Sequence, residues 1–138
     1  MVQEYNVALE DINKVVDALQ KIIDNKNRVV LLQGDLASGK TTLVKSYLQS
    51  SNSTSEVTSP TFCIQNVYDN NFYHYDVYNK TLEEFISLGL LEEFEKEGVH
   101  FVEWGDDTLE ELLKSYGFDI IKITIEKLNN KRRYTIHA

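Results

Sequence analysis

Cysteine and proline are nearly absent from the 138-residue chain, which contains one of each, Cys63 and Pro60. A single cysteine excludes an internal disulfide bond and a metal site built from several thiolates. This cysteine usage is compatible with the reducing cytosol. Because proline fixes its own backbone and restricts the residue before it, Pro60 predicts an extended segment flanked by the hydroxyl groups of Ser59 and Thr61.

Basic residues are also scarce, with 14 lysines and arginines against 22 aspartates and glutamates, which gives a net charge of −8. Binding of nucleic acid depends strongly on neutralising its phosphates. The charge therefore argues against direct strong binding of DNA or RNA by this chain alone. A protein is the partner that the composition favours.

Long apolar runs and flexible linkers are missing too. No stretch approaches the roughly 20 apolar residues that span a membrane, and the polar, acidic start of the sequence lacks the pattern of a secretion signal. No low-complexity tract divides the chain, and its length suits one core. We therefore expect a single domain over residues 1–138, in the cytoplasm and without a membrane segment.

The sequence does contain a phosphate-binding loop pattern, G-x-x-x-x-G-K-[ST], which residues 34–41 match at every fixed position. The aliphatic run 28–33 before the loop predicts a strand buried on both faces. The spacing of apolar residues within 43–48 predicts an amphipathic helix after it. The loop is thus predicted to join a buried strand to a helix.

A loop of this kind has a defined chemistry. The start of a helix offers phosphate oxygens free backbone N–H groups and the positive end of the peptide dipoles. Gly34 and Gly39 would let the backbone approach the phosphates closely. Lys40 would place a positive charge at the β- and γ-phosphates, and Thr41 would offer its hydroxyl to Mg²⁺.

Two acidic residues stand at the ends of predicted strands. Segments 62–68 and 72–78 indicate a β-hairpin whose second arm carries Asp76. The buried run 99–104 carries Glu103 near its end. Beside a phosphate-binding loop, such carboxylates can hold Mg²⁺ or position an attacking water. An exposed aspartate at a strand end is otherwise common.

Two other features are open to more than one interpretation from spacing alone. The Thr-Ser-Pro-Thr segment 58–61 is equally consistent with a loop that senses the γ-phosphate and with a plain polar connection. His74 is most simply a half-buried packing residue.

The rest of the chain completes an α/β pattern. The predicted fold is a single P-loop NTPase domain with a mixed central sheet, parallel core strands, antiparallel hairpins and flanking helices. The further elements that we expect are a helix over 9–25 with Asp11 as a possible cap, two short helices within 81–97 separated by Gly89 and begun by a Thr81–Glu84 capping box, a helix over 107–116, and an antiparallel edge hairpin of 119–127 and 132–137.

Five short motifs follow one another in a specific order. They are Gly-Asp-Leu-Ala-Ser-Gly-Lys-Thr-Thr at 34–42, Thr-Ser-Pro-Thr-Phe at 58–62, His-Tyr-Asp-Val-Tyr at 74–78, Leu-Gly-Leu at 88–90 and Val-Glu-Trp at 102–104. Together they resemble the TsaE (YjeE) family, the bacterial ATPases of tRNA threonylcarbamoyladenosine biosynthesis. The resemblance extends over nearly the whole chain.

This resemblance implies a protein that binds ATP with Mg²⁺ and hydrolyses it when engaged with TsaB and TsaD, the pair that transfers a threonylcarbamoyl group to an adenosine of certain tRNAs. It implies catalytic roles for Glu103, Lys40 and Thr61, and Mg²⁺ ligation by Thr41, Asp76 and Glu103. The nucleotide contacts that it implies come from Gly34, Asp35, Leu36, Ala37, Ser38, Gly39, Lys40, Thr41 and Thr42.

The chain departs from the family pattern at three places. It has Ala37-Ser38 where the family often has Gly-Ala, a small change within the loop. Asn79 stands where an arginine is frequent, so an ion pair made by that arginine would be absent or replaced by Lys80. Gly105 stands where a proline is frequent, which predicts a freer loop beside Glu103.

Other functions of the same loop stay as alternatives. A small-molecule or nucleotide kinase usually clamps its phosphates with several arginines, and this chain has only Arg28, Arg132 and Arg133. A GTPase is disfavoured because the segment 79–82, Asn-Lys-Thr-Leu, lacks the aspartate that reads guanine. A nucleotide-gated binding module, whose hydrolysis is incidental, is the third alternative.

Overall fold

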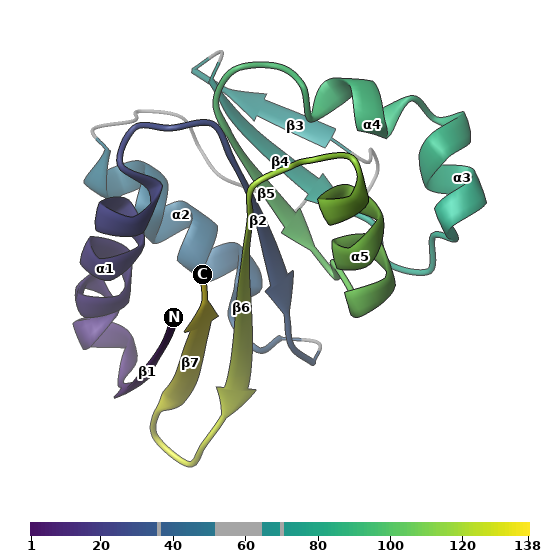
Figure 1. Ribbon diagram of the computed structural model, residues 1–138. Helices are drawn as coiled ribbons and strands as arrows, with labels where there is room; N and C mark the ends of the chain where they lie inside the picture. Colours follow the sequence, from purple (N-terminus) through teal and green to yellow (C-terminus); the bar gives the residue numbers. More distant parts are fainter. Residues whose placement is uncertain (36, 52–64, 70) are drawn as a thin grey trace.

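A mixed β-sheet runs through the centre of the protein in the computed structural model (Figure 1). The structure describes residues 1–35, 37–51, 65–69 and 71–138. Within these residues the sheet has seven strands, in the order β1-β7-β6-β2-β5-β4-β3. The strands are Val2–Val7 (β1), Arg28–Gln33 (β2), Gln65–Tyr68 (β3), Phe72–Asp76 (β4), Val99–Glu103 (β5), Ile120–Lys127 (β6) and Arg132–His137 (β7).

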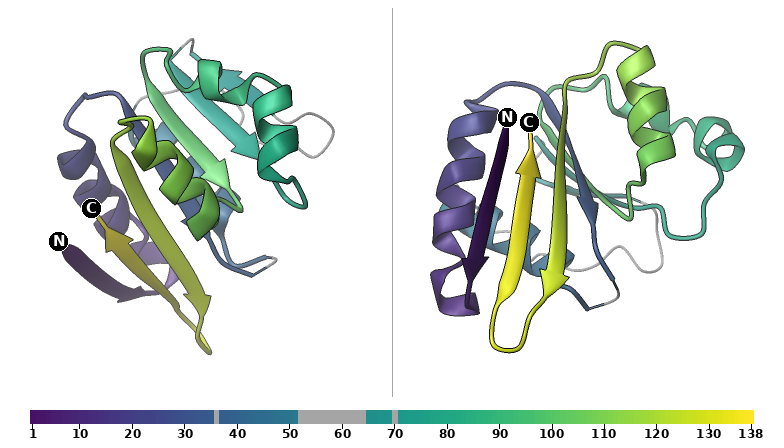
Figure 2. Two further views of the ribbon diagram at one scale, coloured as in Figure 1. Left: turned by 45° about the vertical axis from the view of Figure 1, so that its right-hand side comes forward. Right: turned by 60° about the horizontal axis from the view of Figure 1, so that its bottom comes forward.

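Helices cover both faces of the sheet, as Figure 2 shows from two further directions. One face carries α1 (Asn13–Ile23) and α2 (Lys40–Ser50). The other face carries α3 (Leu82–Ser87), α4 (Leu90–Glu93) and α5 (Asp107–Ser115). The predicted α/β class, with a mixed sheet, parallel core strands and flanking helices, is confirmed.

The position of β2 at the centre of the sheet explains why its sequence is apolar without interruption. It pairs in parallel with β5 on one side and with β6 on the other. Val30 and Leu32 pack in the core beneath α1 and α2, whereas Val29 and Leu31 pack in the core beneath α3, α4 and α5. A strand covered on both faces needs apolar side chains at odd and even positions alike.

The register of the parallel strands brings two acids to one edge of the sheet. Leu32 of β2 is level with Glu103 of β5, and Glu103 is level with Asp76 of β4. The helix α2 begins at this same carboxyl edge, after the loop that follows β2. In parallel sheets this edge is where ligands are commonly bound.

The predicted hairpin around residue 70 and the helices after it are confirmed where the structure describes them. Strands β3 and β4 pair antiparallel, while residues 62–64 of the first predicted arm lie outside the described residues. Thr81 and Glu84 form the predicted capping box of α3. Gly89, with φ of 75°, separates α3 from α4.

The N-terminal region differs from the prediction in two ways. Residues 2–7 form the edge strand β1, which the sequence analysis did not predict. The expected helix over 9–25 is shorter, because a 3₁₀ turn, Leu9–Asp11, precedes α1. Asp11 is not its cap: the N-cap position is occupied by Ile12, and no side-chain capping bond is made there.

The C-terminal hairpin was predicted at an edge of the sheet, and this prediction is wrong. Its two strands, β6 and β7, pair antiparallel as expected. However, β6 also pairs in parallel with β2, and β1 pairs antiparallel with β7. The hairpin therefore lies inside the sheet, because the unpredicted strand β1 covers its outer side.

A buried histidine of β5 links β4 to the turn after α4. The ring of His100 is stacked on Tyr73, with ring centroids 4.3 Å apart. Its Nε2 donates to the carbonyl oxygen of Lys96 at 2.8 Å, so Nδ1 is free to accept from the Tyr75 hydroxyl at 2.7 Å. Both ring nitrogens are thus used by the neutral form, and burial lowers the pKa of His100 below its usual 6.5.

We expect this histidine to make the protein less stable in mild acid. Below pH 6.5 the unfolded chain binds a proton that buried His100 does not, so the free energy of unfolding falls by up to about 1.4 kcal/mol per pH unit. Urea unfolding at pH 7.5 and 5.5 should show that the free energy of unfolding falls further on acidification in the wild type than in His100→Gln. The same loss in both proteins would contradict this, and His137→Gln at the end of β7 is the control.

Candidate functional site

The loop of residues 34–39 leads from the end of β2 into α2 at the carboxyl edge of the parallel strands (Figure 1). Gly39 is the N-cap of α2 and has φ of 111°, a conformation that side chains other than glycine rarely adopt. Ala37 also has a positive φ, of 59°. Leu36 lies outside the described residues, so its nucleotide contact stays a prediction.

Position 34 requires a glycine, because the Ser38 side chain and the Ile125 backbone lie too close to it for a side chain to fit. A Cβ atom at this position would lie 2.5 Å from Ser38 Oγ and 2.7 Å from the carbonyl oxygen of Ile125. The carbonyl belongs to β6 and is fixed by the sheet. The turn after β2 can therefore pass between β6 and the loop only because residue 34 has no side chain.

Lys40 is buried at the first position of α2, with 4% of its surface exposed. Its Nζ donates to the carbonyl oxygens of Gly34 and Asp35 at 2.7 and 3.0 Å. It also lies 3.8 Å from the centroid of the Trp104 ring, a cation–π contact. Burial lowers the pKa of Lys40, while the carboxylates of Glu103, Asp76 and Asp35 oppose that shift.

Glu103 faces the loop from the end of β5. Its side chain is buried, with 4% of the residue exposed, and its Oε2 accepts a 2.7 Å hydrogen bond from the Thr41 hydroxyl. A buried carboxylate is costly unless charges and hydrogen bonds compensate for its lost hydration. The structure thus brings together two of the predicted site residues, one from β5 and one from α2.

His74 supplies a second partner to the same carboxylate. Its Nε2 lies 2.5 Å from Glu103 Oε2, and its Nδ1 lies 3.3 Å from the hydroxyl of Tyr68. The side chain is fully buried. The sequence analysis interpreted His74 as a half-buried packing residue, which is wrong, because it connects the β3–β4 hairpin to the acid of the site.

Asp76 ends β4 next to Glu103 in register. Its Oδ1 accepts a 3.0 Å hydrogen bond from the backbone N–H of Tyr78, and the residue is half-buried. A carboxylate oriented by its own chain beside a second carboxylate is suited to a cation. Thr61, the third predicted catalytic residue, lies outside the described residues.

A cavity of about 350 Å³ collects these side chains. Its lining comprises residues 37–42 together with Asp76, Glu103, Trp104 and Arg132. Gly34 and Asp35 do not reach it and line a neighbouring hollow of about 360 Å³ beside β6. The cavity therefore combines the helix start, a buried lysine, two acids and an arginine.

Arg132, at the start of β7, was not predicted as a site residue. Its Nε donates to the carbonyl oxygen of Ser38 in the loop at 3.0 Å. The next residue, Arg133, points elsewhere and pairs with Glu4 and Glu126 at 3.4 and 3.5 Å. No local pattern distinguishes the two arginines, because only the sheet order brings one of them to the loop.

The donor atoms present fit a magnesium ion that shares its coordination with a nucleotide. Among the described residues no group of three or more His, Cys, Asp and Glu could hold a metal ion by itself. Mg²⁺ is usually bound through one or two carboxylates, with waters and substrate phosphates completing its coordination. The hydroxyl of Thr41 and the carboxylates of Glu103 and Asp76 are donors of that kind, at the edge of one cavity.

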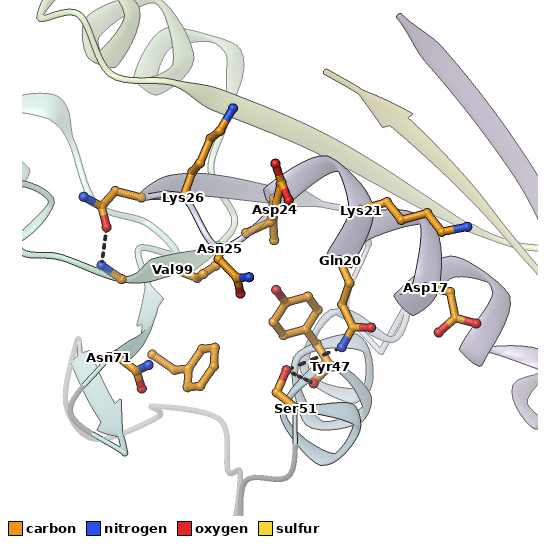
Figure 3. A pocket seen from close by; sticks show the side chains of 14 residues that line it. Asp17, Gln20, Lys21, Asp24, Asn25, Lys26, Tyr47, Ser51, Asn71 and Val99 are labelled. Carbon is orange, nitrogen blue, oxygen red and sulfur yellow. Dashed lines mark hydrogen bonds between the residues drawn. The ribbon is translucent and has the colours of Figure 1, made fainter.

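A larger cavity, of about 880 Å³, lies at the opposite end of the sheet (Figure 3). It is lined by the turn after α1, by the end of α2 and by the first residues of β4 and β5. Gln20 and Ser51 meet across it, with Gln20 Nε2 donating to Ser51 Oγ at 3.5 Å. Since this is the amino-terminal edge of the parallel strands, the cavity is separate from the loop and its acids.

Two departures from the family pattern have a structural outcome. Lys80 forms an ion pair with Glu84 of α3 at 3.9 Å, so its charge is used at the start of α3. Gly105 is buried, and a Cβ there would lie 2.8 Å from Leu31 Cδ2. Close packing against β2 therefore accounts for this glycine, in place of the freer loop that the sequence predicted.

Comparison with known proteins identifies the family. The family model described as threonylcarbamoyl adenosine biosynthesis protein TsaE matches residues 7–135. The chain belongs to the TsaE family. This family acts in the biosynthesis of threonylcarbamoyladenosine in tRNA, and the family predicted from five short motifs is confirmed.

Three relatives of this family member are named tRNA threonylcarbamoyladenosine biosynthesis protein TsaE. The protein from Bacillus subtilis is 33% identical over 86% of this chain and 81% of its own length. The protein from Rickettsia prowazekii is 34% identical over 80% of this chain and 78% of its own length. The match to Treponema pallidum reaches 42% identity, over 61% of this chain and 64% of the relative.

A solved structure shows the same fold. The crystal structure of Bacillus subtilis YdiB superimposes on this family member with a TM-score of 0.68 and 28% sequence identity, over 99% of this chain and 86% of that one. In the described parts of the chain, no helix has both the length and the apolar character needed to cross a bilayer.

Proposed function

We propose that this family member binds ATP with Mg²⁺ and hydrolyses it in the cytoplasm, in support of a TsaB–TsaD pair that modifies adenosine in tRNA. One observation carries the proposal: the buried Glu103 carboxylate meets the Thr41 hydroxyl at 2.7 Å, directly beside the loop and Lys40. A catalytic acid, a hydroxyl ligand and a phosphate-binding helix start thus share one cavity.

The loop supports binding of the phosphates. The first N–H groups of α2 have no partner within the helix, and the residues that carry them, 40–42, line the cavity. Lys40 is already held by two loop carbonyls, which places its charge without further ordering of a flexible side chain. Of the loop residues predicted from the sequence, 37–41 are therefore assigned to the phosphates, with Thr42 beside Thr41 at the helix start.

The acids support the metal and the attack on the γ-phosphate. Thr41, Asp76 and Glu103 would hold Mg²⁺, which supplies charge neutralisation at the phosphate oxygens. Glu103 would also orient a water, because Thr41 and His74 both contact its Oε2 and hold the carboxylate in place. Thr61 is proposed as the residue that senses the γ-phosphate, on the strength of the family motif.

The positive charges favour a slow ATPase over a kinase. Arg28 pairs with Asp119 at 2.6 Å, and Arg133 pairs with Glu4 and Glu126. Of the three arginines, only Arg132 lines the cavity. A single arginine does not form the clamp that two phosphate-bearing substrates need, so we propose weak hydrolysis by the isolated protein and faster hydrolysis with the partner pair.

One experiment tests this function. Release of phosphate from ATP and Mg²⁺ is measured for the protein alone and after addition of the cognate TsaB–TsaD pair. We expect the pair to stimulate hydrolysis and Lys40→Ala to abolish the stimulated rate. Fast hydrolysis without the pair would contradict the proposed gating. Transfer of phosphate to an added small molecule, without stimulation, would favour the kinase.

Arg132 is expected to contribute to nucleotide binding. Its removal deletes one positive charge and the hydrogen bond to Ser38 from the loop, a loss of about 1–1.5 kcal/mol or roughly tenfold in affinity. Titration of ATP should show this weakening for Arg132→Ala. Arg133→Ala, which removes a neighbouring arginine that faces away from the loop, should bind as the wild type does; equal affinities of all three proteins would exclude a role for Arg132.

A further inference from the structure

A chain of hydrogen bonds crosses three strands of the sheet and ends at the acid of the proposed ATP site. The Tyr68 hydroxyl on β3 lies 3.3 Å from His74 Nδ1 on β4. The other ring nitrogen, His74 Nε2, lies 2.5 Å from Glu103 Oε2 on β5. Tyr68 is 7% exposed and His74 is 0% exposed. The two side chains are therefore shielded from water, which would otherwise compete for their hydrogen bonds.

The strand register places these side chains on one face of the sheet. Tyr68 is level with Phe72, two residues before His74. His74 in turn is level with Phe101, two residues before Glu103. Residues two apart on a strand share a face, and Tyr68 and Phe101 both pack in the core beneath α1 and α2. The hydrogen bonds thus step diagonally from strand to strand on the face that α2 covers.

The chemistry of the groups fixes the direction of these bonds. A carboxylate has only acceptor atoms, so His74 Nε2 donates to Glu103. An uncharged imidazole carries one N–H, and with that proton on Nε2 the other ring nitrogen accepts. The Tyr68 hydroxyl therefore donates to His74 Nδ1. In metal sites, the partner of the second ring nitrogen sets the tautomer and the orientation of a histidine in the same way.

A second tyrosine–histidine pair, on the same two neighbouring strands β4 and β5, has a different end point. The Tyr75 hydroxyl donates to His100 Nδ1 at 2.7 Å, and His100 Nε2 donates to the carbonyl oxygen of Lys96 at 2.8 Å. This pair ends on the backbone, so its role is structural. The pair of Tyr68 and His74 ends instead on a side chain that the proposed reaction uses.

Glu103 receives two hydrogen bonds at one oxygen. The Thr41 hydroxyl donates to Oε2 at 2.7 Å, and His74 contacts the same oxygen. Thr41 lines the cavity and is itself a proposed Mg²⁺ ligand, so its bond to Glu103 depends on what the site holds. The bond from His74 comes from within the sheet. With Oε2 held in this way, Oε1 is the oxygen available to the metal or to the attacking water.

We propose that Tyr68 is a positioning residue for ATP hydrolysis, which acts through His74 to hold the Glu103 carboxylate in the orientation that the reaction needs. The inference rests on the proposed function, since Glu103 is the catalytic acid of that function. Tyr68 is not among the described residues that line the cavity. Its effect on the reaction is therefore transmitted by the imidazole and not by contact with the nucleotide.

The first test uses the protein without nucleotide. Histidine rings labelled with ¹⁵N report by NMR which ring nitrogen carries a proton. At neutral pH we expect the His74 proton on Nε2, and we expect Tyr68→Phe to shift the Nδ1 signal of His74 but not that of His100. Tyr75→Phe is the matched control and should shift the His100 signal instead. A His74 ring whose proton is on Nδ1 in the wild type would overturn the inference.

The second test measures ATP hydrolysis in the presence of the TsaB–TsaD pair. We expect Tyr68→Phe to lower kcat about tenfold and to leave KM for ATP within about twofold of the wild type. Tyr75→Phe should change neither constant by more than about twofold. Each substitution removes one buried hydroxyl from a histidine, so urea unfolding of both variants shows how much of any loss is due to stability.

Two variants of His74 test whether Tyr68 acts through this ring. His74→Leu removes the donor to Glu103 and should lower kcat at least about tenfold. His74→Gln has an amide N–H that can replace the ring N–H, and should turn over at least about threefold faster than His74→Leu. In the His74→Leu background, Tyr68→Phe should lower kcat by less than about twofold. A full tenfold loss in that background would mean that Tyr68 acts through another contact, which contradicts the inference.

The outcomes separate the two proposals. A wild-type protein that releases no phosphate from ATP, with or without the pair, would overturn the proposed function and this inference with it. Stimulated hydrolysis by the wild type together with an unchanged kcat in Tyr68→Phe would overturn the inference alone. Equal losses of kcat in Tyr68→Phe and Tyr75→Phe, in proportion to their losses of stability, would assign Tyr68 a structural role and would also overturn it.

Discussion

Replacing Glu103 by glutamine is expected to slow ATP hydrolysis in the presence of the TsaB–TsaD pair by at least about 100-fold, while ATP affinity changes by less than about threefold. The amide keeps the shape of the side chain and its contacts with Thr41 and His74. It removes the negative charge that would orient the attacking water. The change thus acts on the reaction more than on binding of the nucleotide.

The binding half of this prediction has a built-in reporter. Trp104 is the only tryptophan of the chain, and its ring lies against Lys40, so its fluorescence should respond to ATP in the wild type and in Glu103→Gln alike. Phosphate release in the same samples gives the turnover. Glu126→Gln, an exposed position on β6, is the control, and a Glu103→Gln protein that turns over normally would remove Glu103 from the catalytic residues.

Gly34→Ala is expected to reduce ATP affinity by about 30-fold, which corresponds to roughly 2 kcal/mol. The added methyl group meets the fixed carbonyl of Ile125, so the loop has to move away from β6. Displacing the loop misaligns the backbone N–H groups that receive the phosphates. Crowding of this kind also lowers the free energy of unfolding by about 1–3 kcal/mol.

Gly117→Ala separates the loss of binding from the loss of stability. Gly117 follows α5 at φ of 85°, where an added Cβ meets nothing within 4 Å. Backbone strain alone should destabilise this variant by about 1–2 kcal/mol. Isothermal titration with ATP and urea unfolding of both proteins distinguish the two effects: ATP affinity equal to the wild type in Gly34→Ala would refute the role of the close approach.

The centre of the fold could be predicted because its signals are local. Four consecutive apolar residues of β2, the loop pattern after it and the apolar face of α2 all lie within residues 28–50. The capping box of α3 and the glycine that ends it are also local patterns. Each of these depends on interactions within about one turn or one strand, which a single sequence displays.

The edge strand β1 could not be predicted for the opposite reason. Its side chains are mostly exposed or half-buried and include Gln3, Glu4 and Asn6, so no apolar alternation marks it. Its hydrogen-bond partner is β7, more than a hundred residues away. Where pairing is non-local and little apolar surface is buried, sequence pattern carries little information.

The same distinction applies to the site. Lys40, Thr41 and Glu103 belong to short sequence motifs, so the chemical role of each could be inferred from its place in its motif. His74 and Arg132 acquire their contacts only because β4 lies beside β5 and because β7 starts near the loop. Their roles follow from the order of the strands in the sheet, which the sequence predicted only in part.

The pairing of β1 with β7 also bears on the order of events during synthesis. Strand β1 can take its place only after residues 132–137 have emerged from the ribosome, since these supply its hydrogen bonds. In the finished sheet the Met1 amine donates to the Ala138 carbonyl oxygen at 3.1 Å. Closing a loop of this length is slow, so β1 is expected to join the sheet later than the strands that follow it in the sequence.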